Sequence, residues 1–171
     1  MRELMQGLRD ASIKAIRECD NVELLESLRV KYLGKKGELT GILRQMGKLS
    51  AEERPIMGQL ANQLRADIEA ALDERFMRMA IELSKAAVEH GNEPFGAVLV
   101  KDGQIVFTNE NQIFTESDPT FHGELGLLRR FCHETGITDL REYTLYSSCE
   151  PCFMCSGALV WVKLGRLVYG A

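Results

Sequence analysis

The feature that most constrains the fold is an apolar stripe that runs from Met57 to Ala87 without a stop signal. Apolar residues recur along it every three to four positions, which is the spacing of one face of an α-helix. The stripe predicts a single helix of about 30 or more residues, roughly 45 Å long at about 1.5 Å per residue. No single small core can cover a helix of that length. A second helix must therefore fold back along its first half.

Two further stripes precede this helix and supply its partner. Apolar residues with helical spacing run from Leu4 to Ile16 and again from Leu25 to Met46. Asp20 or Asn21, between the stripes, can cap the second helix by accepting a hydrogen bond from a free backbone N–H. Residues 1–76 are therefore expected to be helical and to form an antiparallel, coiled-coil-like hairpin.

Glycines and a capping pattern divide these helices. Gly34 and Gly37 each cost about 1 kcal/mol relative to Ala inside a helix, so a kink or local fraying is expected there. Gly47 is expected to end the second helix. Ser50 followed by Glu53 has the spacing of a capping box, which predicts that the long helix starts nearby.

The chain changes character near residue 76. Residues 1–76 hold 13 Lys or Arg and 13 Asp or Glu, whereas residues 77–171 hold 8 and 12 and contain all three His and four of the five Cys. The second part alternates β-rich runs with helical ones, which favours an α/β unit with helices on a mixed sheet. Lys101–Gln104 is a tight turn of the Asp-Gly type. Strands are expected at 95–100, 105–107, 143–147 and 166–169, and helices at 122–132 and 152–162.

Three of the five cysteines, Cys149, Cys152 and Cys155, lie within seven residues. This spacing is too short for a disulfide framework and is typical of metal ligands. Cys152 and Cys155 begin one predicted helix and His122 begins another, so an imidazole and two thiolates can converge on one Zn²⁺ ion. The fourth position is then left for water, whose pKa the ion lowers to about 7. Glu124, two residues from His122, is close enough to take a proton from that water.

Two alternative interpretations of the cysteines stay open. Cys149 could join His122, Cys152 and Cys155 in a closed structural zinc site that leaves no position for water. A redox-active Cys-x-x-Cys pair is the other alternative, although the surrounding sequence lacks a thioredoxin-like context.

Residues 77–171 resemble the cytidine-deaminase superfamily, and within it the guanine, cytosine and tRNA-adenosine deaminases. His-x-Glu together with Pro-Cys-x-x-Cys is the signature of zinc-dependent nucleobase deaminases. The matching residues are Pro94–Val98, Lys101–Gly103, Asn109, Asn111, Asp118–Thr120, His122–Glu124 and Leu145–Ala158. The resemblance implies a three-layer α/β/α fold, one Zn²⁺ ion per chain, and hydrolytic loss of ammonia from a nucleobase or nucleoside, with guanine or cytosine favoured.

The same resemblance implies roles for individual residues. His122, Cys152 and Cys155 would hold the zinc ion, and Glu124 would be the catalytic group that moves protons. The residues implied to contact the substrate, by side chain or backbone, are Asn111, Phe95, Ala97, Thr120 and Phe121. The superfamily continues with a further helix and strand, so this unit is expected to lack them and its activity to be weakened or lost.

Residues 1–76 resemble the amino-terminal arm of the alpha chain of bacterial phenylalanyl-tRNA synthetase. The matching residues are Leu28–Gly37, Leu39, Thr40, Glu52–Pro55, Gly58 and Asn62. In that family the arm is a helical hairpin that reaches for tRNA, which would make phosphate contacts of Lys31, Lys35, Lys36 and Arg44. The alternative is that these cations form a solvated helix face and do not contact tRNA. Two such resemblances that meet without a linker indicate a chimera.

Charge and hydropathy narrow the range of partners. A net charge of −4 and a pI near 5.5 argue against a globally basic nucleic-acid binder and favour a small-molecule ligand.

No run approaches the roughly 18 apolar residues of a membrane span, and the first residues do not resemble a signal peptide, so the protein is expected in the cytosol. An exposed edge at Leu167–Tyr169 invites pairing with another chain, so a homo-oligomer is expected. A zinc-stabilised oligomer without catalysis is the alternative to a deaminase.

Overall fold

The computed structural model describes residues 1–19 and 21–170 of the chain. The chain divides into two compact units, Met1–Arg75 and Phe76–Ala171. Asp20, one of the two expected caps of the second helix, lies outside the described residues. Among the described residues, no helix is both long enough and apolar enough to cross a membrane.

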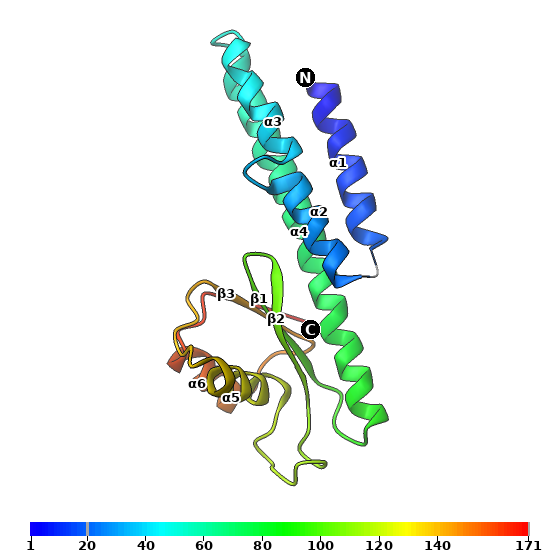
Figure 1. The fold of residues 1–171 in the computed structure, drawn as a ribbon, viewed down its shortest axis with the longest axis vertical. Coiled ribbons are helices and arrows are strands. Elements are labelled where there is room, and N and C mark those ends of the chain that lie inside the picture. Colours follow the sequence, from blue (N-terminus) through cyan, green and yellow to red (C-terminus); the bar gives the residue numbers. More distant parts are fainter. Residues whose placement is uncertain (20, 171) are drawn as a thin grey trace. The chain divides into compact units, whose positions relative to one another are not determined.

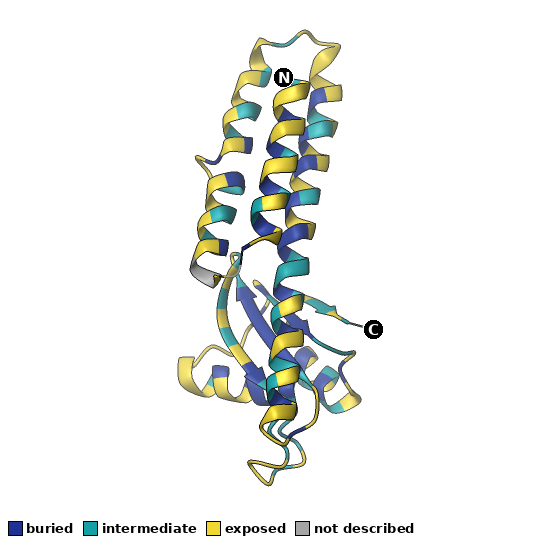
Figure 2. Cartoon of the chain, turned by 90° about the vertical axis from the view of Figure 1, so that its right-hand side faces the viewer, coloured by how far each residue is buried: buried dark blue, intermediate teal, exposed yellow. Residues whose placement is uncertain are grey.

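The first unit is helical, and its helices are drawn in Figure 1. It contains α1 (Arg2–Arg17), α2 (Val22–Leu33), α3 (Glu38–Gln45), the 3₁₀ turn η1 (Met46–Lys48) and the first part of α4 (Glu53–Glu89). The segments α2 and α3 run antiparallel to α4, as the predicted hairpin requires. Helix α1 also packs on the unit, because Arg9 Nε lies 2.5 Å from Asp67 Oδ2 and Arg17 Nε lies 3.3 Å from Glu74 Oε2. Buried apolar residues between the helices form the core, and Figure 2 colours the buried residues of the chain dark blue.

The second stripe forms two helices rather than one kinked helix. Helix α2 ends at Leu33, and α3 begins after Gly37. A Cβ on Gly34 would lie 2.4 Å from the carbonyl oxygen of Val30, so only glycine permits this turn. The hydroxyl of Thr40 donates to the carbonyl oxygen of Gly34 at 2.9 Å, which holds the break closed.

Predicted capping residues make their hydrogen bonds at the starts of α2 and α4. Asn21 Oδ1 accepts a hydrogen bond from the backbone N–H of Leu24 at 3.3 Å. Ser50 Oγ accepts from the backbone N–H of Glu53 at 3.2 Å, and Glu53 Oε2 accepts from the backbone N–H of Ser50 at 3.2 Å. This reciprocal pair is a capping box. It starts α4, whose 37 residues confirm the single long helix.

The second unit is a mixed four-stranded sheet between helices. Its strands are β1 (Gly96–Lys101), β2 (Gln104–Glu110), β3 (Tyr143–Ser147) and β4 (Arg166–Tyr169), in the order β2-β1-β3-β4. β1 is antiparallel to β2 and β3, and β4 is parallel to β3. Helices α5 (Gly123–Thr135) and α6 (Phe153–Trp161) cover one face, and residues 76–89 of α4 cover the other (Figure 1). The three-layer α/β/α arrangement with a mixed sheet is thus confirmed.

Successive side chains of the strands point to opposite faces of the sheet, one toward α5 and the other toward α4. Leu99 and Leu145 are fully buried against Leu127 and Phe131 of α5. On the opposite face, the rings of Phe76 and Tyr146 lie 5.1 Å apart. The two cores cover both faces of β1 and β3, and the candidate site lies where these strands meet the start of α5.

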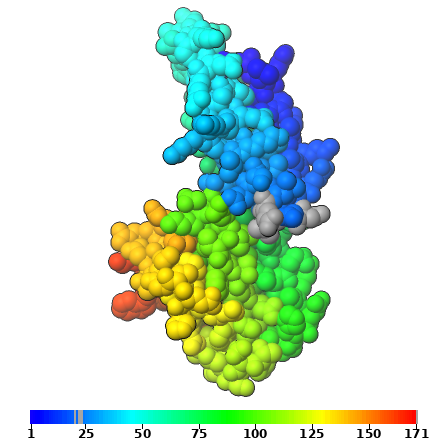
Figure 3. Space-filling model, in the orientation of Figure 1, coloured from blue at the N-terminus to red at the C-terminus, as the bar shows by residue number. Residues whose placement is uncertain are grey.

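The first hairpin follows its turn chemistry closely. Asp102 and Gly103 have φ angles of 52° and 74°, as a two-residue turn with left-handed central residues requires. β2 extends to Glu110, three residues beyond the predicted end, because Gly96–Leu99 pair with Phe107–Glu110. Beyond β2, a loop of residues 111–122 leads to α5 and lies at the surface of the unit, where Figure 3 shows it in yellow-green.

Candidate metal centre

Two helix starts bring three candidate metal ligands together. His122 is the N-cap of α5 and Cys152 is the N-cap of α6, both with extended backbone, and Cys155 lies in the first turn of α6. One ligand atom from each of the three lies within 4.8 Å of the other two. Cys152 Sγ lies 3.6 Å from His122 Nδ1.

This donor set suits a zinc ion. Zn–S bonds of about 2.3 Å and Zn–N bonds of about 2.0–2.1 Å at tetrahedral angles place neighbouring ligand atoms roughly 3.5–4 Å apart. The three side chains are already near that separation. Two thiols and one imidazole favour zinc over the hard cations magnesium and calcium.

Among the described residues, neither Cys149 nor Glu124 belongs to this ligand group. Cys149 is a half-buried free cysteine. Its exclusion counts against the closed four-ligand site. Three protein ligands are the number that catalytic zinc sites use, and such a group would leave a fourth position for water.

The two thiols differ in their surroundings. Cys152 is exposed, whereas Cys155 is fully buried in the first turn of α6. Burial raises the pKa of the Cys155 thiol far above its usual value, and the nearby charge of Glu124 raises it further. A bound divalent cation stabilises a thiolate in such a position, because it supplies the opposite charge that burial otherwise denies.

Glu124 is a buried carboxylate with one firm partner. Its side chain is 5% exposed, and its Oε1 accepts a hydrogen bond from Ser147 Oγ at 2.7 Å. Ser147 ends β3 and is itself buried. Sequence reasoning assigned Ser147 no role. Ser147 lies within the matched run Leu145–Ala158, but no role was predicted for its side chain.

Asn111 lies immediately after β2 and is fully buried. Its backbone N–H donates to the carbonyl oxygen of Phe95 at 2.8 Å, and its Oδ1 accepts from the backbone N–H of Ile113 at 3.2 Å. Within the described part of the chain, Asn111 Nδ2 has no hydrogen-bond partner. A buried donor without a hydrogen-bond partner costs about 1–3 kcal/mol of stability. The Nδ2 group of Asn111 is therefore suited to donate to an acceptor atom of a ligand.

The other predicted pocket residues lie at the start of β1 and just before α5. Phe95 precedes β1 and is held to Asn111 through its carbonyl group, and Ala97 is a buried residue of β1. Thr120 and Phe121 come just before His122. The carbonyl oxygen of Phe121 accepts from the backbone N–H of Gln112 at 3.0 Å, so both strands of the loop are tied together.

Asp118 shapes the turn that leads into the metal ligands. Its Oδ1 accepts from the hydroxyl of Thr120 at 2.6 Å and from the Thr120 backbone N–H at 2.8 Å. Arg129 Nη1 donates to its Oδ2 at 3.0 Å. The hydrogen bonds from Thr120, together with Arg129, lower the pKa of Asp118. The turn is therefore held by a charged carboxylate at neutral pH.

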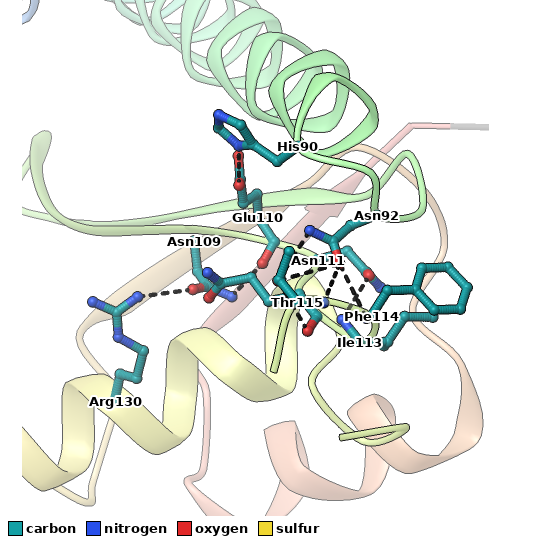
Figure 4. Close-up of polar contacts among 10 residues, drawn as sticks. His90, Asn92, Asn109, Glu110, Asn111, Ile113, Phe114, Thr115 and Arg130 are labelled. Carbon is teal, nitrogen blue, oxygen red and sulfur yellow. Dashed lines mark hydrogen bonds and ion pairs between the residues drawn. The ribbon is translucent and has the colours of Figure 1, made fainter. Parts of the chain in front are cut away.

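Two further asparagines hold the loop through hydrogen bonds, and Figure 4 shows them with their partners. Asn92 Oδ1 accepts from the backbone N–H groups of Phe114 and Thr115 at 3.1 and 3.2 Å. Asn109 Nδ2 donates to the carbonyl oxygens of Glu110 and Gly123 at 2.8 and 3.0 Å. Sequence reasoning gave Asn92 no part in the site, because its partners lie more than 20 residues further along the chain.

The cations expected to contact tRNA belong to the first unit. Lys31, Lys35, Lys36 and Arg44 are exposed. Lys31 Nζ lies 3.7 Å from Glu38 Oε1, and Arg44 Nη2 lies 3.4 Å from the carbonyl oxygen of Lys35. Lys35 and Lys36 lie in the turn between α2 and α3.

Comparisons with protein families match both parts of the chain. Residues 70–171 match the family described as the cytidine and deoxycytidylate deaminase zinc-binding region. Residues 20–87 match the N-terminal domain of class II aminoacyl-tRNA synthetases. The chain therefore combines two segments of different family origin, and the predicted chimera is confirmed.

Individual relatives agree with this division. Guanine deaminase of Bacillus subtilis is 41% identical over 99 residues, which cover 57% of this chain and 64% of that protein. The phenylalanine–tRNA ligase alpha subunit of Oceanobacillus iheyensis is 47% identical over 89 residues, which cover 52% of this chain and 26% of that subunit. The chain thus spans less than two thirds of either relative.

Solved structures resemble the second part. The crystal structure of the Bacillus subtilis guanine deaminase matches with a TM-score of 0.55 and 41% identity over 57% of this chain and 63% of that one. A structure from a study of tRNA:A34 deaminases matches with a TM-score of 0.55 and 36% identity over 57% of this chain and 71% of that one.

Proposed function

Because the chain belongs to the family of the cytidine and deoxycytidylate deaminase zinc-binding region, we propose that residues 77–171 form a zinc-dependent hydrolytic deaminase domain and residues 1–76 a separate helical arm. The substrate of the deaminase domain is a nucleobase or nucleoside, with guanine or cytosine favoured. The observation that carries the proposal is the convergence of an imidazole and two thiols beside a buried carboxylate that is not one of the ligands.

His122, Cys152 and Cys155 would hold one zinc ion per chain. When bound, the ion supplies a water molecule that ionises near neutral pH. The two thiols and the imidazole would be the three protein ligands that a catalytic zinc site uses, and Cys152 is exposed at the surface of the unit.

Glu124 moves the protons in this proposal. A hydrolytic deamination takes a proton from the attacking water and delivers protons to the departing amine nitrogen, so one nearby carboxylate can serve both steps. The hydrogen bond from Ser147 to Oε1 holds the carboxylate of Glu124 in one orientation. Ser147 is thus a positioning residue for Glu124.

Asn111 binds the substrate. Its unpartnered Nδ2 is a buried donor that can meet a ring nitrogen or carbonyl oxygen of a base. The backbone around Phe95 and Ala97 and the segment Thr120–Phe121 would form the walls of the pocket.

The test replaces Glu124 by Gln in the full chain. Ammonia release from guanine, cytosine and adenosine is measured, with zinc content determined by mass spectrometry on the same samples. Glu124→Gln should lower kcat by about 10²–10⁴ and retain one zinc ion per chain, since the amide keeps an oxygen for Ser147. Glu116→Gln, in the loop before His122, is the matched control and should change neither quantity. Zinc binding without turnover in the unmodified chain would instead favour the non-catalytic oligomer.

A tRNA-binding role for the first unit is the second candidate. It is favoured by the synthetase match over residues 20–87 and by the exposed Lys35 and Lys36 in the turn between α2 and α3. Retention of tRNA should then fall steeply with salt, and replacing both lysines by Glu should abolish it. Retention that is insensitive to both changes would exclude this role.

A further inference from the structure

Asn109, near the end of β2, is a buried side chain whose amide group has a defined orientation. Its exposed fraction is 4%. Arg130 Nη1 of α5 donates to its Oδ1 at 3.3 Å, and Figure 4 shows this contact. Arginine carries donors only, so the amide oxygen must face Arg130. The amide nitrogen therefore faces the opposite way, toward two backbone carbonyl groups.

These two carbonyl groups belong to the peptide bonds directly before the two proposed functional side chains. The carbonyl oxygen of Gly123, 3.0 Å from Nδ2, lies in the peptide bond to Glu124. The carbonyl oxygen of Glu110, 2.8 Å from Nδ2, lies in the peptide bond to Asn111. The two N–H bonds of an amide group diverge by about 120°, which places the two carbonyl oxygens roughly 5 Å apart. One nitrogen atom thus joins the backbone of Glu124 to that of Asn111.

Gly126, in the first turn of α5, makes room for this amide group. A Cβ at Gly126 would lie 2.7 Å from Asn109 Nδ2 and 2.6 Å from Phe121 Cε1, so one of these side chains would have to move. The side chain of Asn109 therefore lies directly against the backbone of α5. A larger residue at this position would push the amide nitrogen away from the carbonyl oxygens that it binds.

We propose that Asn109 is a positioning residue of the deaminase site and sets the distance between Glu124 and Asn111. This inference rests on the proposed function, because that function gives both residues their roles. Gly123 also follows His122 directly, so the same hydrogen bond restrains the backbone of a proposed metal ligand. Loss of such outer hydrogen-bond partners typically lowers metal affinity or activity by about 10–100-fold. An asparagine with a merely structural role would change stability and leave zinc affinity and turnover as they are.

Two variants remove this link in different ways. Asn109→Asp keeps an oxygen for Arg130 and removes both donors. Gly126→Ala keeps Asn109 and displaces its amide group; alanine favours a helix over glycine, so a weakened α5 cannot explain its effect. Thr135→Val is the matched control. It removes a hydroxyl that donates to the carbonyl oxygen of Phe131 at 2.7 Å, at the far end of the same helix.

The experiment measures the zinc dissociation constant of the full chain by competition with a chromophoric chelator, and ammonia release at saturating zinc. The absorption spectrum of the cobalt-loaded chain reports the geometry of the ligands without turnover. Asn109→Asp and Gly126→Ala should each raise the zinc dissociation constant about tenfold or more, shift the cobalt bands and lower kcat/KM about tenfold or more. Thr135→Val should change none of these. The double variant should be little worse than either single variant, because both remove the same link.

Circular dichroism checks that every variant is folded. Zinc dissociation constants and cobalt spectra that stay unchanged in both variants, or that change equally in Thr135→Val, would overturn the proposal. These two measurements need no turnover, so they separate the role of Asn109 from the proposed function. An unmodified chain that binds zinc and releases no ammonia would overturn the deaminase, and the zinc dissociation constants would still decide whether Asn109 positions His122.

Discussion

Replacing Asn111 by Leu should make the protein more stable and less active at the same time. The unpartnered Nδ2 costs about 1–3 kcal/mol in the free protein, and leucine of similar size removes that cost. The change also removes the acceptor of the Ile113 N–H bond, which is worth about 0.5–1.5 kcal/mol. The net expectation is a gain of about 1 kcal/mol in the free energy of unfolding. The substrate loses a hydrogen bond, so kcat/KM should fall about tenfold or more.

The assay pairs urea unfolding with ammonia release on the same preparations. Asn109→Leu is the matched control, because both Nδ2 bonds of Asn109 are made and Arg130 Nη1 donates to its Oδ1 at 3.3 Å. The control should lose about 2–4 kcal/mol of stability, since its removal leaves buried partners unpaired. The reasoning would be refuted if Asn111→Leu destabilised the protein as much as Asn109→Leu and left kcat/KM unchanged for every base.

Three further outcomes are expected. Cys152→Ser should abolish zinc binding, whereas Cys149→Ser should retain one ion per chain; equal loss in both, measured by mass spectrometry, would restore the four-ligand site. The hydrogen bond from Arg141 lowers the pKa of Asp139 from 3.8 to about 2, so its stabilising effect is complete above about pH 4 and is lost as pH falls toward 2. Asp139→Asn should therefore flatten the acid-unfolding curve in that window, and an unchanged curve would contradict the pairing. Phe131→Ala, in an aromatic cluster of the core, should cost about 3–5 kcal/mol in urea unfolding, and a cost below about 1 kcal/mol would be inconsistent with its burial.

Local signals predicted those parts of the fold that local chemistry decides. The capping box at Ser50 and Glu53 and the turn at Asp102 and Gly103 both lie where their residue types demand. The end of β2 was placed too early, because residues 108–110 become strand only by pairing with β1, a contact that no local pattern encodes. The break at Gly34 is predicted from sequence only as a kink or local fraying. Its extent depends on the hydroxyl of Thr40, six residues away.

The residues of the candidate site also differ in whether the sequence could predict them. The ligand positions follow from two short motifs at helix starts, so His122 and Cys152 could be predicted from spacing together with helix periodicity. The supporting residues could not. Ser147 meets Glu124 across 23 residues and Asn92 holds a loop more than 20 residues away, and both contacts depend on how strands and helices are layered.

The unequal exposure of Cys152 and Cys155 has a practical consequence for handling the protein. An alkylating reagent added to metal-free material would reach the surface sulfur at once and the interior one only after α6 unravels. The mass increments at these two sulfurs would then appear in two separate kinetic phases. Counting adducts per molecule would distinguish loaded from empty protein without any enzymatic measurement.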